Sequence, residues 1–347
     1  MQRNGICVAG SLILDRHHTV GSYPDEGFLA SVKKTDFSIG GTGNLIIDLC
    51  KLDSTLLVNV MAVVGEDDSG DKLLSVLGGY KNADLSGVCR EGESSVTLVM
   101  NAEDTKQRTF FYIPGSSDVF DESKINWGNI NSRIFHLEYL LLMKRVDSPD
   151  PEYGTHGARI LKHAKDRGMI TSFDMVSEKS ERVREVVVPA LKYTDICCIN
   201  ESEAEAVTGI NLTRGGTLCD AAVREALLML HKLGVCKWVV IHSPKKSYGY
   251  DATGDDTVVC ESLKLPDGFI KGTTGAGDAF LSGILYGAYS GYSLKESMEL
   301  AVATAACSLS ENNGTDGMRS LDEVKKLRRE LESAKGMRSN SVLDLEP

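Results

Sequence analysis

Hydrophobic residues along the chain form two patterns, short continuous runs and runs with helical spacing. The continuous runs predict strands buried on both faces, at residues 5–14, 56–65, 133–140, 169–175, 195–200 and 237–243. Helical spacing begins near Asn44, where Leu45, Leu49 and Leu52 share one face. Two further runs, 95–101 and 107–113, flank the polar stretch AEDTK and predict a β-hairpin.

From residue 133 onward, predicted strands and helices alternate. Helices are expected near 154–167, 178–192, 201–209 and 218–233. This alternation predicts a parallel sheet with right-handed crossovers. Ligands of such sheets bind at the carboxyl ends of the strands. Because Asp174 and Asn200 end strands and Asp278 lies at a loop-to-helix junction, we expect these three residues at one edge.

The expected organisation is one α/β domain over residues 1–334, without internal repeats. A small β appendage is expected from segments near 15–40 and 95–115. Residues 335–347 are expected to form a frayed tail.

Composition and charge exclude several classes of protein. The 347 residues are 42% hydrophobic and 25% charged, as in an ordinary globular protein. No apolar run reaches the roughly 18 residues of a membrane span, and the N-terminal apolar run is too short for a secretory signal. The net charge of −11 argues against a nucleic-acid partner. Nine cysteines without a CxxC pair predict free thiols in a reducing compartment, so a cytoplasmic location is expected.

The segment IKGTTGAGDAF, residues 270–280, places small residues and one carboxylate at the start of a predicted helix. A helix start leaves N–H groups unpaired and carries partial positive charge, and Gly275 and Gly277 let the backbone approach a ligand. This combination predicts an anion pocket for a phosphate whose charge builds up during transfer. Asp278 is placed to accept a proton from a substrate hydroxyl. Taken alone, GAGD also suits a simple turn before a helix.

This segment is one of several along the chain that together resemble a known family of proteins. TTGAGDAFLSG resembles the C-terminal signature of the ribokinase-like, or PfkB, family of carbohydrate kinases. CCINESEAEAVTG resembles the N-x-x-E segment of the family, ICVAGSLILD its first strand, and AVATAACSLSENNGTDG the helix and loop that close its nucleotide pocket. The matches extend from about residue 5 to about residue 325. The resemblance implies the ribokinase-like α/β fold, with a central mostly parallel sheet flanked by helices and a small β-strand lid.

The resemblance also implies roles for individual residues. Asp278 stands in the place of the catalytic base, and the backbone of Gly275, Ala276 and Gly277 in that of the anion hole. Asn200 and Glu203 correspond to residues that act, through water, on Mg²⁺ and the phosphates of ATP, which suits a cation that keeps several waters. The matched nucleotide-binding segments also contain Thr273 and Asn313.

Residues implied to contact the sugar are polar or small, and carboxylates and amides suit a polyol because each makes two hydrogen bonds. They are Asp15, Gly40, Gly41, Asn44 and Glu138. Structural interpretations stay open beside these roles: Asp15 as a turn residue, Glu138 as half of a buried pair, Asn200 as a helix cap and Glu203 on a solvated helix face.

The chain departs from the family pattern at three places. IGGTGN has two residues between Gly41 and Asn44, where the family has three. HSPKKSYG replaces the T-x-G-x-x-G segment, so no adenine-pocket residue is carried over. Gly272 replaces an aspartate that ligates K⁺ in many relatives, so we expect the potassium site to be empty or filled by Lys271.

We therefore expect a kinase that uses ATP and Mg²⁺ to phosphorylate a primary hydroxyl of a sugar or sugar derivative, with the lid as a candidate homodimer contact. Three alternatives remain. The aromatic residues Phe110, Phe111 and Tyr112 in the predicted lid favour a nucleoside kinase of the same fold. A phosphate-binding regulator without catalysis is disfavoured by the retained motifs. A Rossmann dehydrogenase is disfavoured because Ile46 stands where the third fingerprint glycine is needed.

Overall fold

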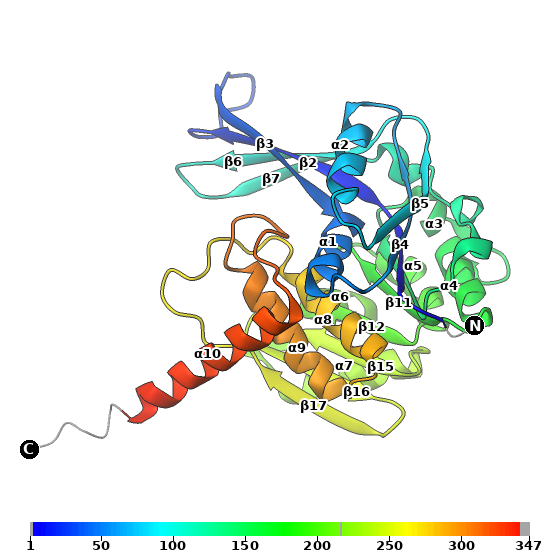
Figure 1. The fold of residues 1–347 in the computed structure, drawn as a ribbon, viewed down its shortest axis with the longest axis vertical. Helices are drawn as coiled ribbons and strands as arrows, with labels where there is room; N and C mark the ends of the chain where they lie inside the picture. Colours follow the sequence, from blue (N-terminus) through cyan, green and yellow to red (C-terminus); the bar gives the residue numbers. More distant parts are fainter. Residues whose placement is uncertain (1–2, 216, 341–347) are drawn as a thin grey trace, which may run out of the picture.

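The large sheet forms the centre of the molecule. The structure is a computed structural model that describes residues 3–215 and 217–340. Within these residues nine strands form this sheet, in the order β17-β16-β15-β12-β11-β8-β1-β4-β5 (Figure 1). They are β1 (Ile6–Gly10), β4 (Val58–Val64), β5 (Ala83–Arg90), β8 (Ile134–Leu140), β11 (Ile170–Met175), β12 (Ile196–Asn200), β15 (Trp238–His242), β16 (Lys246–Asp251) and β17 (Asp256–Glu261). Pairs from β5 to β15 are parallel and the last two are antiparallel, so the expected mostly parallel sheet is confirmed.

Helices cover both faces of this sheet. Successive side chains of a strand point to opposite faces, so each strand packs against helices on both sides. In β1, Ile6 and Val8 pack with the helices of one face, whereas Cys7 and Ala9 pack with those of the other. The first face holds α1 (Thr42–Leu52), α2 (Asp68–Leu77), α8 (Ala276–Ser290), α9 (Leu294–Ser308) and α10 (Leu321–Asn340). The second holds α4 (His156–Asp166), α5 (Arg182–Leu191), α6 (Glu201–Thr208) and α7 (Asp220–Lys232).

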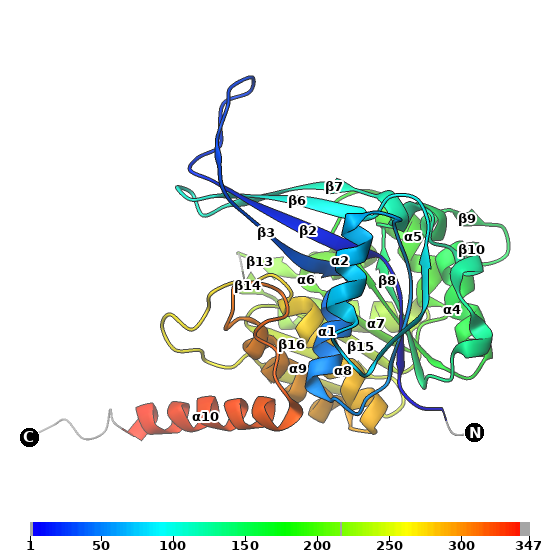
Figure 2. The same ribbon diagram turned by 45° about the horizontal axis from the view of Figure 1, so that its top comes forward.

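A second sheet of four strands, called the small sheet below, projects beyond the large one (Figure 2). Its order is β3-β2-β6-β7, with β2 (Leu12–Val20), β3 (Val32–Gly41), β6 (Ser95–Ala102) and β7 (Arg108–Ile113). The predicted single strand 5–14 is therefore two strands that meet at Ser11. At Ser11 the backbone passes from the large sheet to the small one. Ser11 N–H donates to Glu138 O, and Ser11 O accepts from Thr42 N–H.

One face of the small sheet, called the inner face, carries three rows of directly paired residues. The rows are Ser38–Asp15–Thr97–Tyr112, Asp36–His17–Val99–Phe110 and Lys34–Thr19–Asn101–Arg108. Paired residues of neighbouring strands point to the same side. Residues of the last two rows and of the loop 311–316 line a cavity of about 650 Å³, so the inner face looks toward the C-terminal loops.

The C-terminal helix extends further than the sequence predicted. Helix α10 continues to Asn340, through a stretch rich in Lys, Arg, Glu and Leu, which favour helices. The expected frayed tail at 335–347 thus begins inside a helix, and residues 341–347 lie outside the described part. Among the described helices, none is both long and apolar enough to cross a membrane.

Candidate active site

Asp278 occupies the first turn of α8 and is buried. The helix begins after Gly275, whose φ of 77° suits glycine and whose added Cβ would lie 2.5 Å from Gly314 Cα. Asn44 Nδ2 donates to Asp278 Oδ2 over 2.9 Å, and the Tyr139 hydroxyl donates to Asp278 Oδ1. Donors from α1 and from β8 therefore fix the orientation of the carboxylate.

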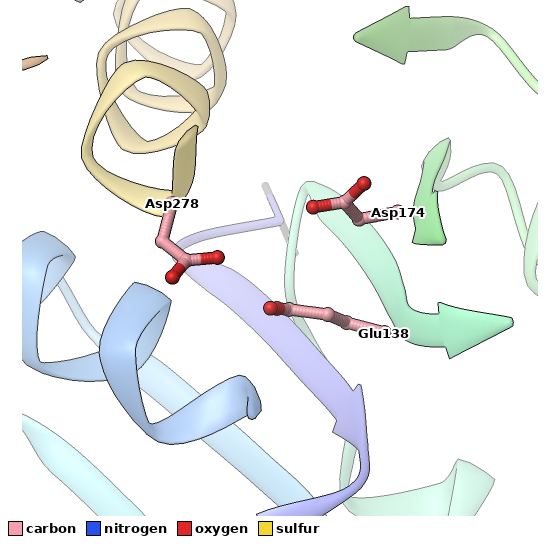
Figure 3. A group of neighbouring side chains, drawn as sticks. All are labelled: Glu138, Asp174 and Asp278. Atoms are coloured by element: carbon pink, nitrogen blue, oxygen red, sulfur yellow. The ribbon is translucent and has the colours of Figure 1, made fainter. Parts of the chain in front are cut away.

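Three carboxylates converge at this point, those of Glu138, Asp174 and Asp278, from β8, β11 and α8 (Figure 3). One oxygen of each lies within 4.8 Å of the others. Glu138 is fully buried, and neither of its carboxylate oxygens has a hydrogen-bond partner among the described residues. Like charges this close in a buried place need a cation or a shared proton.

Burial and mutual repulsion raise the pKa values of the three acids. Burial raises the pKa of Glu138 to about 8. Burial, and then the charge of Glu138, raises the pKa of Asp278 to about 7, against the donors Tyr139 and Asn44. Burial, followed by the charge of nearby Glu203, raises the pKa of Asp174 well above its usual value. Glu138 and Asp278 therefore titrate near neutral pH, where a base must accept a proton.

His136 does not compensate these charges. Its Nε2 lies 3.5 Å from Glu138 Oε2, and both side chains are fully buried. Burial lowers the pKa of His136 to about 3, so the imidazole is neutral at neutral pH. The buried pair that the sequence left open for Glu138 is thus not an ion pair.

The residues expected at the sugar lie around the same point. Asp15 in β2 is close enough for the charge of Asp278 to raise its pKa, which burial, the larger cause, brings to about 6. An added Cβ on Gly40 would lie 2.5 Å from Asp15 Oδ2, so a side chain there would displace the Asp15 carboxylate. Asn44 Oδ1 is buried without a partner among the described residues. Gly41 instead forms the turn from β3 into α1.

Asn200 and Glu203 form a capping box at the start of α6, as the structural interpretation of Asn200 predicted. Glu203 N–H donates to Asn200 Oδ1, and Asn200 N–H donates to Glu203 Oε2, each over 2.9 Å. Ser177 Oγ donates to Glu203 Oε1 over 2.6 Å. Glu203 is buried rather than on a solvated face. A carboxylate oxygen has a second lone pair, so contact with a water remains open to both oxygens.

A cavity of about 630 Å³ opens beside the first turn of α8. It is bounded by Asn200, by Thr273, Ala276 and Gly277, by residues of the matched motifs that were not singled out individually (Glu201, Ser202, Phe280, Val302, Ala305, Ala306 and Leu309), and by residues outside those motifs (His242, Ser243, Pro244, Ser247, Ser262, Leu263, Leu265 and Ile270). Mixed apolar walls with a few polar groups suit a nucleotide base and ribose. Asn313, which was expected here, lines the cavity of the small sheet instead.

Gly272 lies against the backbone of the loop that follows α9. An added Cβ would be 2.8 Å from Asn312 O and 3.0 Å from Glu311 O. The ammonium of Lys271 pairs with Glu311 Oε1 over 2.9 Å, and both side chains are largely exposed. The ammonium of Lys271 is therefore engaged by the loop after α9, and close backbone packing accounts for Gly272.

Comparisons with known proteins agree with this geometry. A structure of Arabidopsis thaliana ribokinase complexed with ribose and ATP superposes with a TM-score of 0.77, covering 94% of this chain and 99% of that one at 21% identity. The fold is thus the ribokinase-like fold. The ATP-dependent 6-phosphofructokinase of Thermoanaerobacterium thermosaccharolyticum is 21% identical over 93% of this chain and 95% of its own. The probable fructokinase-7 of A. thaliana is 25% identical over 92% of this chain and 90% of its own.

The family itself follows from the whole sequence. The pattern of the pfkB family carbohydrate kinases matches residues 3–321. The chain belongs to this family. The expected enzyme class, an ATP-dependent carbohydrate kinase, is thereby confirmed.

Proposed function

We propose that this enzyme transfers the γ-phosphoryl group of ATP to a primary hydroxyl of a sugar or sugar derivative, with Asp278 as the general base. The observation that carries the proposal is the position of Asp278. It lies buried at the N-terminus of a helix, next to Gly275 and Gly277, with both oxygens fixed by donors. The acceptor sugar would lie between Asp278 and Asp15.

Each residue has a physical task in this scheme. Asp278, with a pKa raised to about 7 by burial and by Glu138, takes the proton of the attacking hydroxyl. In the first turn of α8, the N–H groups of Gly277 and Asp278 have no acceptor within the helix and are available to the phosphoryl oxygens, whereas Ala276 N–H donates to Thr273 O over 3.4 Å. Asp15, Asn44 and Glu138 bind the other hydroxyls, because each has unsatisfied or weakly engaged polar atoms.

The residues present also fit a divalent cation. Both oxygens of Glu138 lack partners, and Asp174 lies within reach of them. Asn200 and Glu203 are engaged in the capping box, which favours contact through water rather than direct ligation. Mg²⁺ bound with ATP would supply charge compensation for the phosphates at this point. Glu203 and Asp174 are the residues that we expect to orient its water shell.

A nucleoside is the second candidate acceptor. Phe110 is 60% exposed on the inner face of the small sheet, in the row that contains His17, one row from Asp15. An aromatic ring at this position suits stacking on a base. A screen of possible acceptors therefore has to include nucleosides as well as sugars.

The test is an ADP-release assay over pentoses, hexoses, their derivatives and nucleosides, with ATP and Mg²⁺ present. We expect ADP release above the acceptor-free rate for at least one sugar. Asp278→Asn is expected to abolish most of that difference, while the matched control Asp256→Asn, at an exposed position on β17, leaves it unchanged. Acceptor-dependent turnover that survives in Asp278→Asn would refute the assignment of the base.

A further inference from the structure

Asp48 is a buried acid for which the proposed reaction has no task. It lies in α1 and is fully buried. Within the described part of the chain, neither of its carboxylate oxygens has a hydrogen-bond partner. The ammonium of Lys51, the cation nearest to it in sequence, donates instead to Thr315 O over 2.9 Å. A carboxylate without a partner is strongly disfavoured in such a place, so Asp48 needs either a bound cation or a proton.

A further unpartnered oxygen lies one helical turn before Asp48. Asn44 Oδ1 is buried and accepts from no donor of the described residues, while Nδ2 of the same amide donates to Asp278 Oδ2 over 2.9 Å. Residues four apart share one face of a helix, and helical side chains lean toward its N-terminus, so the Asp48 carboxyl leans toward the Asn44 amide. Gly314 covers this amide without a side-chain donor, since its added Cβ would lie 2.9 Å from Asn44 Oδ1.

The charges around Asp48 favour its neutral form. Burial, the largest cause, and then the charge of Asp278 raise the pKa of Asp48 well above its usual value. A protonated carboxyl has one O–H donor, which is the group that Asn44 Oδ1 lacks. The titratable groups that face Asp48 are Lys51 on α1, Asp278 on α8, Glu138 on β8, Cys307 on α9 and Tyr80 after α2.

We propose that Asp48 is a positioning residue for the base: as a neutral acid it donates a hydrogen bond to Asn44 Oδ1. This role rests on the proposed kinase function, in which Asp278 takes the proton of the acceptor. The bond holds the Asn44 amide in the orientation in which Nδ2 points to Asp278. A donor on Oδ1 also strengthens the bond that Nδ2 makes, because hydrogen bonds in a chain polarise one another.

This bond leaves the other tasks of Asn44 open. A carbonyl oxygen has two lone pairs, so one lone pair of Asn44 Oδ1 stays available to the acceptor sugar. A carboxylic acid also accepts through its C=O oxygen, so Asp48 can follow the amide if a substitution of Asp278 makes it turn. The proton of Asp48 stays on Asp48 throughout the reaction.

The consequence for catalysis is a lower pKa of the base. The hydrogen bond from Asn44 lowers the pKa of Asp278, against the larger effects of burial and of the charge of Glu138. If the Asn44 amide turned over, its Oδ1 would face Asp278 Oδ2, and two acceptors would oppose each other. Asp278 would then accept a proton from solution at a higher pH, so a larger share of the enzyme would be inactive near neutral pH.

The experiment measures the acid limb of the kcat/KM profile, which reports the ionisation of Asp278. Asp48→Asn keeps a donor for Asn44 Oδ1, so its limb should coincide with that of wild type. Asp48→Ala removes the donor and should move the limb up by about one pH unit, so that kcat/KM below the limb falls about tenfold. Asp48→Leu, which leaves no room for a replacing water, should do the same. The control Ile47→Val, at a buried neighbour on α1, should lower Tm without moving the limb.

Two measurements without an acceptor test the proton on Asp48. At about pH 8, the infrared difference between wild type and Asp48→Asn should contain the C=O band of a protonated carboxylic acid, shifted in heavy water. In melting curves, the Tm of Asp48→Asn should rise relative to wild type as the pH increases from about 5 to about 8. The unfolded chain ionises Asp48 above its usual pKa of 3.8 while the folded protein keeps the proton, so rising pH destabilises wild type through this residue.

The contrary outcomes can be told apart. An ionised Asp48 would raise the pKa of Asp278 by its charge, so a limb that moves down in Asp48→Asn and in Asp48→Ala would indicate a carboxylate with a bound cation. A limb that moves in no variant of Asp48 would indicate a purely structural acid. Either result would overturn this role and leave the proposed function standing. A wild type that transfers phosphoryl to no acceptor would overturn both proposals, whatever the infrared band shows.

Discussion

Replacing the proposed base should make the protein more stable while it removes activity. In Asp278→Asn the shape of the side chain is kept, and the Tyr139 hydroxyl can still donate to the amide oxygen. Asn44 can meet the new amide by turning its own, since its Oδ1 is free of partners among the described residues. The substitution therefore removes a buried charge without leaving new donors unpaired. It also removes the proton acceptor, so kcat should fall by about 10² to 10⁴.

The size of the stability gain in Asp278→Asn follows from the pKa of Asp278 in the folded and unfolded protein. In the folded protein the carboxyl of Asp278 titrates at about 7, because of burial and of Glu138, and in the unfolded chain near 3.8. Ionisation then favours the unfolded chain, so wild type loses stability as the pH rises from the lower value to the higher one. The full difference is on the order of 4 kcal/mol, at about 1.4 kcal/mol for each pKa unit. Because Glu138 and Asp174 also lose a repelling neighbour, we expect a gain of about 2 to 4 kcal/mol above neutral pH.

Calorimetric or dye-based melting curves of both proteins test this reasoning. For a chain of this length, an unfolding entropy of about 2 cal/mol/K per residue converts the gain into roughly 3 to 6 °C in Tm. The gain should be larger at about pH 8 than at about pH 5, because less of the carboxyl is ionised at the lower pH. An equal or lower Tm of Asp278→Asn at the higher pH would refute the raised pKa, whatever happens to activity. The exposed control Asp256→Asn should melt as wild type does.

Three further predictions concern neighbours of the base. Tyr139→Phe removes a donor that lowers the pKa of Asp278, so the acid limb of the kcat/KM profile should move up by about one pH unit; a profile that stays in place would show that the hydrogen bond is not made in solution. Glu203→Gln should keep the helix cap, since the amide oxygen still accepts from Asn200 N–H, but should raise the Mg²⁺ needed for half-maximal rate about tenfold; a changed sugar KM with an unchanged Mg²⁺ requirement would contradict the role of Glu203. Because Gly272 offers no carboxylate, potassium chloride should raise turnover no more than tetramethylammonium chloride does, and a several-fold rise specific to potassium would contradict this expectation.

The sequence predicted the strands of the parallel sheet well, because a strand buried on both faces is a continuous apolar run. It missed β5, β16 and β17, which lie toward the sheet edges, where polar residues such as Asp84 and Lys246 interrupt the apolar pattern. A strand that leaves one sheet for another at Ser11 also gives no signal in hydrophobic periodicity. The correct interpretation needs the hydrogen bonds of Ser11, which join residues far apart in the chain.

For the site, motifs identified Asp278, Asn200 and Glu203, whose spacing is local. Tyr139 was not singled out, because it contacts Asp278 across more than a hundred residues of sequence. Asp174 was placed at the correct sheet edge from its position after a strand, but its closeness to Glu138 follows only from the register of β8 and β11. Asn313 was expected at the nucleotide and lines another cavity, since the loop that holds it turns toward the small sheet.

Phosphorus NMR of the reaction product tests the central claim most directly. The enzyme is incubated with ATP, Mg²⁺ and the best acceptor of the screen, and the proton-coupled phosphorus spectrum is recorded. Transfer to a primary hydroxyl predicts a new phosphate ester signal split into a triplet by the two protons of the attached carbon, absent with Asp278→Asn. A doublet would mean a secondary hydroxyl, and a signal of inorganic phosphate alone would mean hydrolysis; either result would contradict the proposed function.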